Sequence, residues 1–589
     1  MINYDIIEFS LDGKELINKN PLKLTEGQKK SLENGDAIYI YKSDTGFYIG
    51  QTTNFRRRNN DHYTKDKNKE EFIKANFKEV IVIFSEEFNG TVLNDIENRF
   101  IVYFRTDGCN LININDGQKA TTYAKSDDIE SDVILKVWEE ELYKKRKWVN
   151  TPTLNELRNN VLFKYSPIKT LSENQEKLLE EIIANPSKNY VVNGDAGTGK
   201  TVLLTHLVAK LLDINKGKDD KHKKKIRVLV QLNWEKTARN IFEAYGMPED
   251  DYFKVSTSNK VINEDKKYDI IIVDEAHKLS RRYGKQQPTN NEAYKEENHD
   301  GKYKDCNSHL EILQKIGKQI ILMYDIFQKV RPANISREMF KELTNGYEKR
   351  FLKTQFRIKS PVGKNYTSDD YINGIKYLLY KDTGLLESEL ANFNPNFNRD
   401  VFRDKSIDAY FGYFKTEPLH NLTKWLGNDR THNKNHINRI LAGLVEPWSL
   451  KEGRDSKIKQ WHEGDIHYRW NSTQEDWLNS HDSDAKFQIG SIFSVQGLDL
   501  NKVGVLIGND LEVDSNGKLK GNPANLKNRN SNYKKEEMKD EYYKREFTLQ
   551  VLNNYYVLLT RGIDGVRLGF WENDGFRKYM EKTLEIIDD

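Results

Sequence analysis

The eight residues GDAGTGKT lie between an apolar run, NYVVNG, and a helical pattern, VLLTHLVAKLL. They fit G-x-x-x-x-G-K-[ST] in the strand–loop–helix setting that this phosphate-binding loop requires. Gly194, Gly197 and Gly199 let backbone N–H groups turn toward phosphate oxygens. Lys200 adds a positive charge for the β- and γ-phosphates, and Thr201 offers a hydroxyl to Mg²⁺. The loop therefore predicts an ATP site with Mg²⁺, in which Thr201 is a metal ligand.

Two further apolar runs, YDIIIV and QIILMY, end in polar residues. The first ends in Asp274, and an acid at the end of a strand beside a phosphate-binding loop can hold Mg²⁺. Glu275 follows it and is suited to polarise the attacking water. Gln328 follows the second run and is expected to sense the γ-phosphate. These residues predict ATP hydrolysis, with Asp274 as a second metal ligand.

A separate group of reactive residue types lies nearer the N-terminus. Tyr39 and Tyr48 fall on two alternating runs joined by a short turn, so a hairpin would place both phenols on one face. Arg58 and His62 follow with i, i+4 spacing, on one face of a predicted helix. Glu97 opens the segment ENRFI of a later predicted helix.

Phosphodiester cleavage needs residues of these types. A carboxylate such as Glu97 holds a divalent metal, which neutralises the phosphate and helps to form the nucleophile. An arginine stabilises the developing charge, and a phenol or imidazole moves a proton. Because no cysteine or second acidic cluster accompanies Glu97, a one-metal site fits better than a two-metal site.

Residues 35–118 resemble the GIY-YIG endonuclease domain. The resemblance implies one set of catalytic residues: Tyr39, Tyr48, Arg58, His62, Glu97 and Asn110. It implies that Tyr39 acts as a general base, and that Glu97 binds Mg²⁺ or Mn²⁺. Ala37 stands where the signature of the family has glycine.

Residues 166–575 resemble a superfamily 1 helicase. The segment LSENQ is similar to the Q motif, whose glutamine, here Gln175, reads adenine. TQFR resembles motif IV and NNYYVLLTRG resembles motif VI, which implies that Arg357 and Arg561 reach the γ-phosphate from a second lobe. SVQGLD, which contains Gly497, resembles motif V. The residues of motifs V and VI are most similar to those of the Schlafen group 3-like helicase domain.

Tryptophans between motifs IV and V have two interpretations. They either stack on the bases of a single strand or pack in the core: Trp425, Trp448, Trp461, Trp470 and Trp477.

Two systems of apolar patterning must position these residues. Up to residue 118, period-2 strands, short turns and helices near 54–62, 68–76 and 90–106 predict a small α+β domain. From about residue 166, strands that are apolar on both faces alternate with helices, which predicts parallel α/β sheets. We therefore expect an α/β multidomain chain, in which a small α+β nuclease domain precedes a two-lobed RecA-like parallel-sheet core. The expected parts are an N-terminal extension (1–34), the nuclease-like domain (35–118), a helical linker (119–165), a first lobe (166–350) and a second lobe with insertions (351–589).

Composition limits the function classes. The chain has 589 residues, with 93 Lys and Arg against 90 Asp and Glu, so any basic groove must be local. Two cysteines, Cys109 and Cys306, exclude a disulfide scaffold and a Cys-rich zinc site. No apolar run reaches the roughly 18–20 residues that span a bilayer, and no signal-peptide pattern is present. A cytoplasmic protein without a membrane partner is expected.

Three functions agree with these features. The first is an ATP-dependent DNA helicase or translocase with a metal-dependent endonuclease, in defence against phage or foreign DNA or in repair; the defence role rests on family analogy. The second is a nucleotide-gated sensor whose ATPase licenses the nuclease without unwinding. The third is a motor whose nuclease-like domain only recognises branched or nicked DNA. Single-stranded DNA, duplex DNA and RNA are open as substrates, and a homo-oligomer or a neighbouring defence protein is open as a partner.

Overall fold

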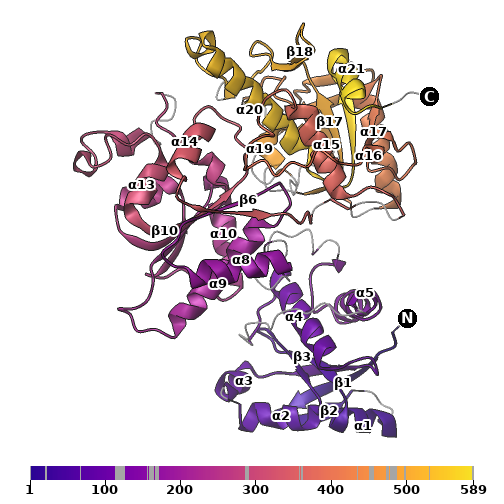
Figure 1. Ribbon diagram of the computed structural model, residues 1–589. Helices are drawn as coiled ribbons and strands as arrows, with labels where there is room; N and C mark the ends of the chain where they lie inside the picture. The colour runs from indigo at the N-terminus through magenta and orange to yellow at the C-terminus, as the bar shows by residue number, and fades with distance from the viewer. Residues whose placement is uncertain are drawn as a thin grey trace. The chain divides into compact units, whose positions relative to one another are not determined.

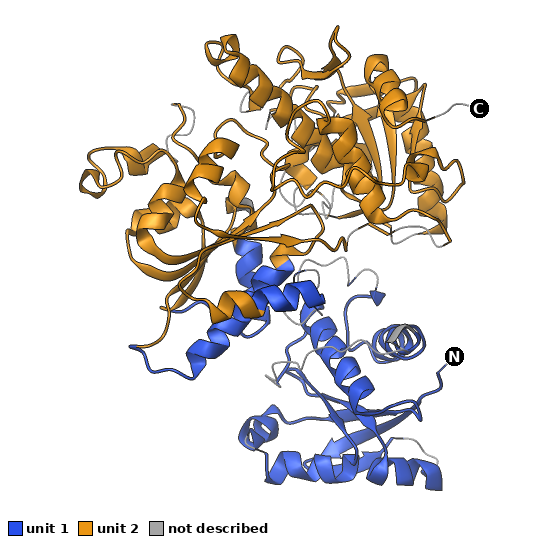
Figure 2. Cartoon of the chain, viewed as in Figure 1, with its two compact units in different colours: residues 1–179, 202–221, 236–250 blue, residues 180–201, 222–235, 251–589 orange. Residues whose placement is uncertain are grey.

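The computed structural model describes most of the chain, and Figure 1 labels many of its helices and strands. The described residues are 2–19, 23–66, 68–112, 126–154, 157, 165, 171–284, 291–356, 358–359, 363–433, 436–449, 455, 457–471, 477, 487–495, 499–528 and 531–586. The chain divides into two compact units, which Figure 2 colours separately. The first comprises residues 1–179, 202–221 and 236–250, and the second comprises residues 180–201, 222–235 and 251–589.

An antiparallel sheet of five strands organises the N-terminal part of the first unit. Its order is β2-β1-β5-β3-β4, with bounds β1 Asp5–Asp12, β2 Glu15–Asn18, β3 Ala37–Lys42, β4 Phe47–Thr52 and β5 Glu79–Phe84. Residues 1–34, expected as an extension, thus supply two strands of this sheet. β1 pairs with β5, which buries Ile7 and Phe9.

Helices cover both faces of this sheet. One face packs against α1 (Glu26–Asn34), α2 (Phe55–Thr64) and α3 (Lys69–Ala75), and the other packs against α4 (Gly90–Thr106). Residues 126–145, expected as a linker, form α5 (Ser126–Ile129) and the π-helical segments Glu130–Ile134 and Val137–Lys145. Trp138 is buried there against the rings of Tyr103 and Phe104 of α4. Within the expected linker, the described residues 126–154 therefore contribute to the core on the α4 face.

The second unit contains two larger sheets. The first sheet is wholly parallel, in the order β11-β6-β10-β9-β7-β8. Its strands are β6 Tyr190–Gly194, β7 Ile226–Leu229, β8 Phe253–Ser256, β9 Tyr268–Val273, β10 Gly317–Tyr324 and β11 Glu348–Leu352. The apolar runs that predicted parallel strands form β6, β7, β9 and β10, and the buried residues of these strands explain why the runs do not alternate.

The second sheet is parallel except for its terminal β14–β15 pair, in the order β12-β20-β17-β13-β16-β15-β14. Its strands are β12 Phe411–Phe414, β13 Arg439–Ala442, β14 Trp461–Glu463, β15 Ile466–Trp470, β16 Gln488–Gly490, β17 Leu500–Ile507 and β20 Gly562–Phe570. A separate hairpin joins β18 (Leu511–Val513) to β19 (Leu519–Gly521). The two sheets confirm the predicted α/β fold class.

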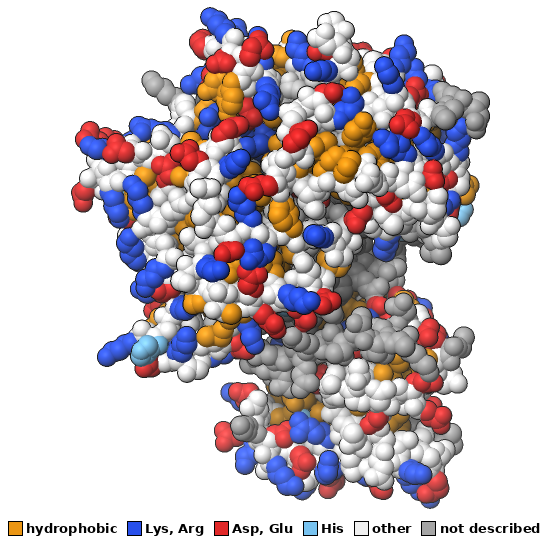
Figure 3. All heavy atoms as spheres, in the orientation of Figure 1, with side chains coloured by type: hydrophobic (Ala, Val, Ile, Leu, Met, Phe, Trp, Pro, Cys, Tyr) orange, Lys and Arg blue, Asp and Glu red, His pale blue; other side chains and the backbone are white. Residues whose placement is uncertain are grey.

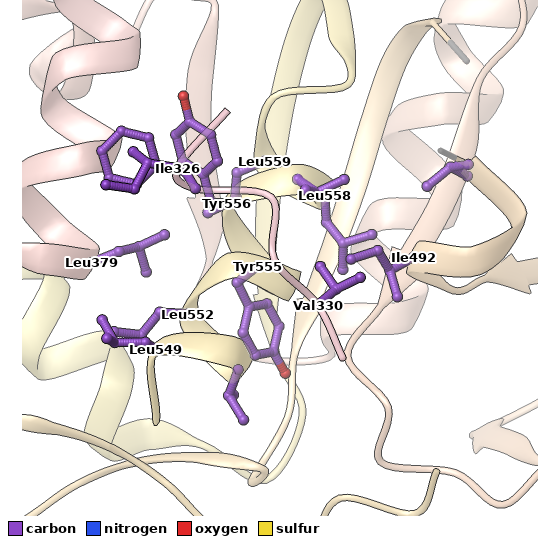
Figure 4. Packing of buried hydrophobic residues seen from close by; sticks show 14 of the residues in the cluster. Ile326, Val330, Leu379, Ile492, Leu549, Leu552, Tyr555, Tyr556, Leu558 and Leu559 are labelled. Carbon is purple, nitrogen blue, oxygen red and sulfur yellow. The ribbon is translucent and has the colours of Figure 1, made fainter. Parts of the chain in front are cut away.

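The main α-helices from residue 173 onward are α8 Glu173–Ala184, α9 Lys200–Lys216, α10 Leu232–Ala244, α11 Ser258–Glu264, α13 His309–Ile316, α14 Arg337–Leu343, α15 Ser368–Tyr380, α16 Asp400–Arg403, α17 Pro418–His432, α19 Ile492–Val495, α20 Glu541–Leu559 and α21 Asp574–Thr583. The segment after β10 packs against two of them, α15 and α20 (Figure 4). The Phe327 ring lies 4.8 Å from Tyr380 and 5.2 Å from Tyr556, between ring centroids. Within the second unit, one apolar core therefore includes both the segment after β10 of the first sheet and the helices α15 and α20, which lie with the second sheet.

Charge is mixed on the surface. On the face shown in Figure 3, basic and acidic side chains are interspersed, in keeping with the net charge of +3. None of the helices that the structure describes is both long and apolar enough to cross a bilayer.

Candidate active sites

The two signature tyrosines share one face of the N-terminal sheet, as predicted. The hairpin pairs Tyr39 with Gly50 and Tyr41 with Tyr48. The rings of Tyr39 and Tyr48 stack, with centroids 6.4 Å apart and planes 2° apart. This is the face that α2 covers, so the next helix in the chain can reach both phenols.

Gly50 lets the Tyr39 ring lie across the hairpin. A Cβ at position 50 would stand 2.3 Å from the Tyr39 hydroxyl oxygen and 2.5 Å from Cζ. Such a distance is far below van der Waals contact, so only glycine leaves room for the phenol here. This close approach gives a physical reason for the glycine that ends the Tyr48-Ile49-Gly50 signature.

Gly50→Ala is expected to displace the Tyr39 ring and to reduce cleavage by about 10²-fold, as a misplaced catalytic group does. Overpacking should also lower the free energy of unfolding by about 1–3 kcal/mol. Cleavage rates and thermal unfolding measure the two effects. Gly90→Ala is the control, because a Cβ there meets nothing within 4 Å. Wild-type cleavage in Gly50→Ala would show that the position of the Tyr39 ring does not matter.

α2 brings Arg58 and His62 to the Tyr39 hydroxyl. The helix begins after Asn54, whose side chain accepts a hydrogen bond from the Arg57 N–H. His62 Nε2 lies 3.0 Å from the Tyr39 hydroxyl oxygen, and Arg58 Nε donates to the same oxygen at 3.3 Å. The predicted i, i+4 pair therefore converges on one phenol.

The local environment keeps both His62 and Tyr39 neutral. Burial lowers the pKa of His62, and the positive charge of Arg58 lowers it further. Burial also raises the pKa of the Tyr39 phenol, and Tyr48 adds to the rise, whereas Arg58 acts against it. A neutral imidazole beside a neutral phenol can accept the phenolic proton, while the guanidinium favours the phenolate.

Glu97 lies in the middle of α4, on the opposite face of the sheet from Tyr39. It approaches the same region around β4, which is the last strand of the sheet. Its carboxylate accepts a hydrogen bond from Gln51 Nε2 at 2.8 Å. The charge of Glu97 raises the pKa values of Tyr39 and Tyr48, so it lies within electrostatic reach of both phenols.

The environment of Glu97 fits a divalent metal. Burial raises the pKa of its carboxyl, against the Gln51 hydrogen bond and the Arg58 charge, and a bound cation would offset this cost. The Asn94 amide oxygen accepts a hydrogen bond from the same Gln51 side chain. Hard oxygen ligands of this kind suit Mg²⁺, which usually binds through one or two carboxylates and keeps several waters.

Asn110 lies at the turn of the β3–β4 hairpin. Its side chain donates to the Thr45 carbonyl at 2.9 Å, and its own carbonyl accepts from the Phe47 N–H. Asn110 therefore fixes the turn that sets the register of the two tyrosines. Its catalytic role remains a prediction.

The glycine-rich loop of residues 194–201 joins β6 to α9, as predicted. Gly197 and Gly199 adopt φ values of 88° and 78°, a left-handed backbone that favours glycine. Lys200 Nζ donates to the carbonyls of Gly194 and Asp195, and lies 3.8 Å from a carboxylate oxygen of Asp325. The loop thus has the backbone that the phosphate-binding motif requires.

Two predicted metal ligands meet beside this loop. Thr201 Oγ1 donates to Asp274 Oδ2 at 3.3 Å. They meet because β9, β10 and β6 are neighbouring parallel strands, whose carboxyl ends share one edge. Burial raises the pKa of Asp274, and the adjacent Glu275 carboxylate raises it further. A hydroxyl and a carboxylate are the oxygen ligands that Mg²⁺ takes in nucleotide sites, so these residues fit the ion.

Glu275 follows in a left-handed backbone conformation, with φ 52° and ψ 49°. Non-glycine residues rarely adopt this conformation, and the strain is typical of functional sites. The Glu275 carboxylate lies 2.9 Å from His277 Nε2. Although burial acts to raise the pKa of Glu275, Lys278 and His277 hold it well below its ordinary value. An ionised carboxylate is suited to the predicted polarisation of water.

Gln328 lies at the end of the segment after β10. Its side-chain amide donates to Asp325 Oδ2 at 2.7 Å, and Asp325 is the residue near Lys200. Gln328 is therefore connected to the loop lysine through one carboxylate, an arrangement that can carry the predicted γ-phosphate sensing.

Sequence reasoning missed a buried contact of Asp195. Lys376 of α15 is fully buried, and its Nζ lies 2.8 Å from Asp195 Oδ2. Tyr556 of α20 donates to Asp195 Oδ1 at 3.3 Å. Gln355 Nε2 also donates to the Ala196 carbonyl at 2.6 Å. Segments that follow the first sheet therefore hold the glycine-rich loop in place.

Lys376→Met is expected to destabilise the second unit by about 3–5 kcal/mol, because it leaves the Asp195 carboxylate buried without its cation. Urea unfolding measures the loss. Lys381→Met, at the end of the same helix on a partly exposed lysine, is the control. Adding Asp195→Asn to Lys376→Met should restore part of the stability, and strict additivity would show that the pair does not interact.

The other predicted residues of the ATP site come from parts of the chain before and after the glycine-rich loop. Arg561 follows α20, is buried, and donates from Nε to the Val557 carbonyl at 3.2 Å. Its charge lowers the pKa of Lys278, so it lies in electrostatic reach of that neighbour of Glu275. Gln175, in the first unit, closes a capping box by accepting from the Ser172 N–H at 3.0 Å. Arg357 and Gly497 lie outside the described residues.

The burial of the five tryptophans favours a packing role over base stacking. Trp461, Trp470 and Trp477 are buried in the core of the second unit. Trp425 and Trp448 pack against that core while partly buried.

Comparisons with known proteins find two domains in the chain. The family described as "Schlafen group 3, DNA/RNA helicase domain" matches residues 187–572, and the "GIY-YIG catalytic domain" matches residues 37–109. An uncharacterised protein of Saccharomyces cerevisiae, YPL245W, is 26% identical over 468 residues, which cover 72% of this chain and 91% of the yeast protein.

Similar solved structures are helicases of low sequence identity. The helicase domain of Pyrococcus furiosus Hef is 10% identical with a TM-score of 0.30, and covers 69% of this chain and 96% of its own. Pif1 helicase from Candida albicans is 13% identical with a TM-score of 0.28, and covers 71% and 98%. Since the helicase family matches more than half of the sequence, the chain belongs to the Schlafen group 3 DNA/RNA helicase family, and it carries a GIY-YIG catalytic domain at residues 37–109.

Proposed function

We propose that the chain is an ATP-driven superfamily 1 helicase or translocase that cleaves DNA with its own metal-dependent endonuclease. One observation carries the proposal. The same chain holds the Tyr39 phenol between His62 and Arg58, and holds Lys200 in a glycine-rich loop beside the Thr201–Asp274 pair. Neither arrangement is needed for packing alone.

The nuclease residues have separate roles in the proposal. Tyr39 takes a proton from the attacking water, and His62 Nε2 accepts the proton of the phenol. Arg58 stabilises negative charge on the phenolate and on the phosphate. Glu97 would hold the divalent cation, Mg²⁺ or Mn²⁺, which supplies charge neutralisation at the phosphate.

In the proposal, some residues of the ATPase bind the nucleotide and its Mg²⁺ or orient water, and others couple the loop to the second sheet. Lys200 and the loop N–H groups bind the phosphates, and Glu275 orients water toward the γ-phosphate. Thr201 and Asp274 would hold Mg²⁺, which neutralises charge on the β- and γ-phosphates. Lys376 and Tyr556 tie Asp195 of the loop to helices that pack on the second sheet, so changes at the phosphates reach that sheet. Such coupling is what a stepping motor requires.

Defence against phage or other foreign DNA is the biological role we propose. It rests on the pairing of a motor with a nuclease, which suits the destruction of long DNA. DNA repair is the alternative within the same chemistry, and RNA is an alternative substrate, because the family description names both nucleic acids.

A nucleotide-gated sensor is the second candidate function. The contacts of Asp195 with Lys376 and Tyr556 favour it, since ATP bound at the loop could change these contacts without processive movement. Strand displacement separates the two candidates: a motor displaces an annealed strand only with ATP, whereas a sensor does not.

Cleavage of supercoiled plasmid and of single-stranded DNA with Mg²⁺, with and without ATP, tests the proposal. We expect cleavage that depends on Mg²⁺ and changes with ATP, together with ATP-dependent strand displacement. Cleavage that ignores ATP would mean two independent modules. The absence of cleavage of DNA, with cleavage of RNA, would replace the proposed substrate.

A further inference from the structure

Asp66 lies directly beyond α2 and contacts both catalytic side chains of that helix. One carboxylate oxygen, Oδ2, lies 2.7 Å from His62 Nδ1. The other, Oδ1, accepts a hydrogen bond from Arg58 Nη1 at 2.9 Å. Its own N–H donates to the Asp61 carbonyl at 3.0 Å, which fixes the residue against the last turn of the helix.

The contact with Asp66 determines the tautomer of His62. An ionised carboxylate only accepts hydrogen bonds, so the His62 nitrogen that faces it must carry the proton. Nδ1 is then the donor, and Nε2 of the neutral ring is left as an acceptor. The Tyr39 hydroxyl lies 3.0 Å from Nε2 and therefore donates its proton to it.

Asp66 also directs the guanidinium. Arg58 uses Nη1 for Asp66 and Nε for the Tyr39 hydroxyl, so the carboxylate holds the arginine against the phenol. The imidazole is clamped in addition by Phe72, whose ring stacks on it with centroids 4.4 Å apart and planes 8° apart. Two groups that act on Tyr39 thus share one anchor.

We propose that Asp66 is a positioning residue of the nuclease site, which fixes the Nδ1–H form of His62 and holds Arg58 against the Tyr39 phenol. The inference rests on the proposed nuclease function. The catalytic side chains implied by the family resemblance, from Tyr39 to Asn110, do not include this carboxylate.

The proton path that follows is balanced. The phenolic proton passes to His62 Nε2 as Tyr39 takes a proton from the attacking water. The water oxygen bonds to phosphorus, the bond from phosphorus to the leaving oxygen breaks, and that oxygen takes a proton from a second water. The hydroxide so formed is neutralised by the proton that His62 Nε2 releases. Tyr39 already carries the proton of the attacking water, so both side chains end the cycle in their neutral forms. The Asp66 carboxylate, which faces Nδ1, stabilises the imidazolium while it exists.

Other charged and titratable groups also face His62. Its own helix contributes Arg58 and Asp61, and the sheet contributes the phenols of Tyr39, Tyr41 and Tyr48. α3 contributes the apolar Phe72. Asp66 and Asp61 both act to raise the pKa of His62, and Arg58 acts to lower it. Removal of the Asp66 charge should therefore lower the pH at which His62 becomes protonated.

The first test reads the tautomer without any substrate. Carbon-13 NMR of the full chain labelled at histidine, with His62 assigned from His62→Gln, distinguishes Nδ1–H from Nε2–H through the Cδ2 shift. We expect Nδ1–H in the wild type and in Asp66→Glu, and a loss of this form with a lower His62 pKa in Asp66→Asn. Asp61→Asn removes one negative charge from α2 itself, next to His62, and should keep the tautomer. An unchanged tautomer in Asp66→Asn would overturn the inference.

The second test is cleavage as a function of pH. Asp66→Asn should lower kcat by about 10²-fold, with little change in KM, and should move the acid limb of the profile to lower pH. Asp66→Glu should recover part of the rate, and Asp61→Asn should cleave like the wild type. Wild-type kcat in Asp66→Asn would overturn the positioning role. If the wild type cut no nucleic acid, the proposed function would fail, while the tautomer measurement would still decide the role of Asp66.

Discussion

Glu97→Gln is expected to reduce cleavage by about 10³-fold or more, because a bound cation supplies several kcal/mol of charge stabilisation and each 1.36 kcal/mol is tenfold in rate. The substitution keeps the shape of the side chain but removes the charge that would hold the metal. ATP hydrolysis should not change, since the residues proposed to hold Mg²⁺ at the ATP site are a separate pair, Thr201 and Asp274. Initial rates of plasmid nicking over a Mg²⁺ titration, beside rates of phosphate release, measure both activities.

Because the Glu97 carboxylate is largely buried, Glu97→Gln can separate a loss of the metal from a loss of stability. The raised pKa of Glu97 shows that its charge is costly without a partner, so the neutral glutamine should not destabilise the domain. Glu86→Gln is the control, because Glu86 is exposed in the turn before α4. Cleavage at the wild-type rate in Glu97→Gln would show that another group holds the metal. A parallel fall in unfolding temperature would instead indicate a structural role.

Local patterns explain why part of the nuclease site was predictable. A hairpin fixes its own register through its turn, so Tyr39 and Tyr48 were placed on one face by counting residues. The helical period placed Arg58 and His62 together in the same way. The same counting extends to Asp66, four residues beyond His62, but an acid just past a helix is ordinary in sequence. Only the two hydrogen bonds of its carboxylate distinguish it.

Long-range contacts explain what the sequence analysis missed. β1 joins the sheet by pairing with β5, whose residues lie about 70 positions later. The sequence of neither segment indicates that the other is its partner. Lys376 and Asp195 are separated by 181 residues, so their ion pair has no local signature. Glu97 approaches Tyr39 from the opposite face of the sheet, around an edge strand. The sequence pattern could identify Glu97 as a candidate carboxylate, but it could not predict from which face of the sheet Glu97 approaches Tyr39.

Lys200→Ala is expected to reduce ATP turnover by at least about 10²–10³-fold, the effect of losing one group that stabilises charge in the transition state. Lys200 is the cation of the glycine-rich loop, and in the structure its ammonium already lies among the carbonyls of Gly194 and Asp195 and the Asp325 carboxylate. Steady-state phosphate release measures the loss, and Lys210→Ala, on the exposed side of α9, is the control.

The effect of Lys200→Ala on cleavage decides between coupled and independent modules. If ATP hydrolysis drives the nuclease, ATP should no longer change cleavage in this variant, whereas Mg²⁺-dependent cleavage without ATP should equal that of the wild type. Since Tyr39, His62 and Arg58 form their hydrogen bonds within one small domain, the chemical step itself needs no contribution from the ATP site. ATP turnover at the wild-type rate in Lys200→Ala would show that residues 194–201 are a structural turn and not the ATP site. Lost turnover with cleavage still responsive to ATP would mean that nucleotide binding, and not hydrolysis, controls the nuclease.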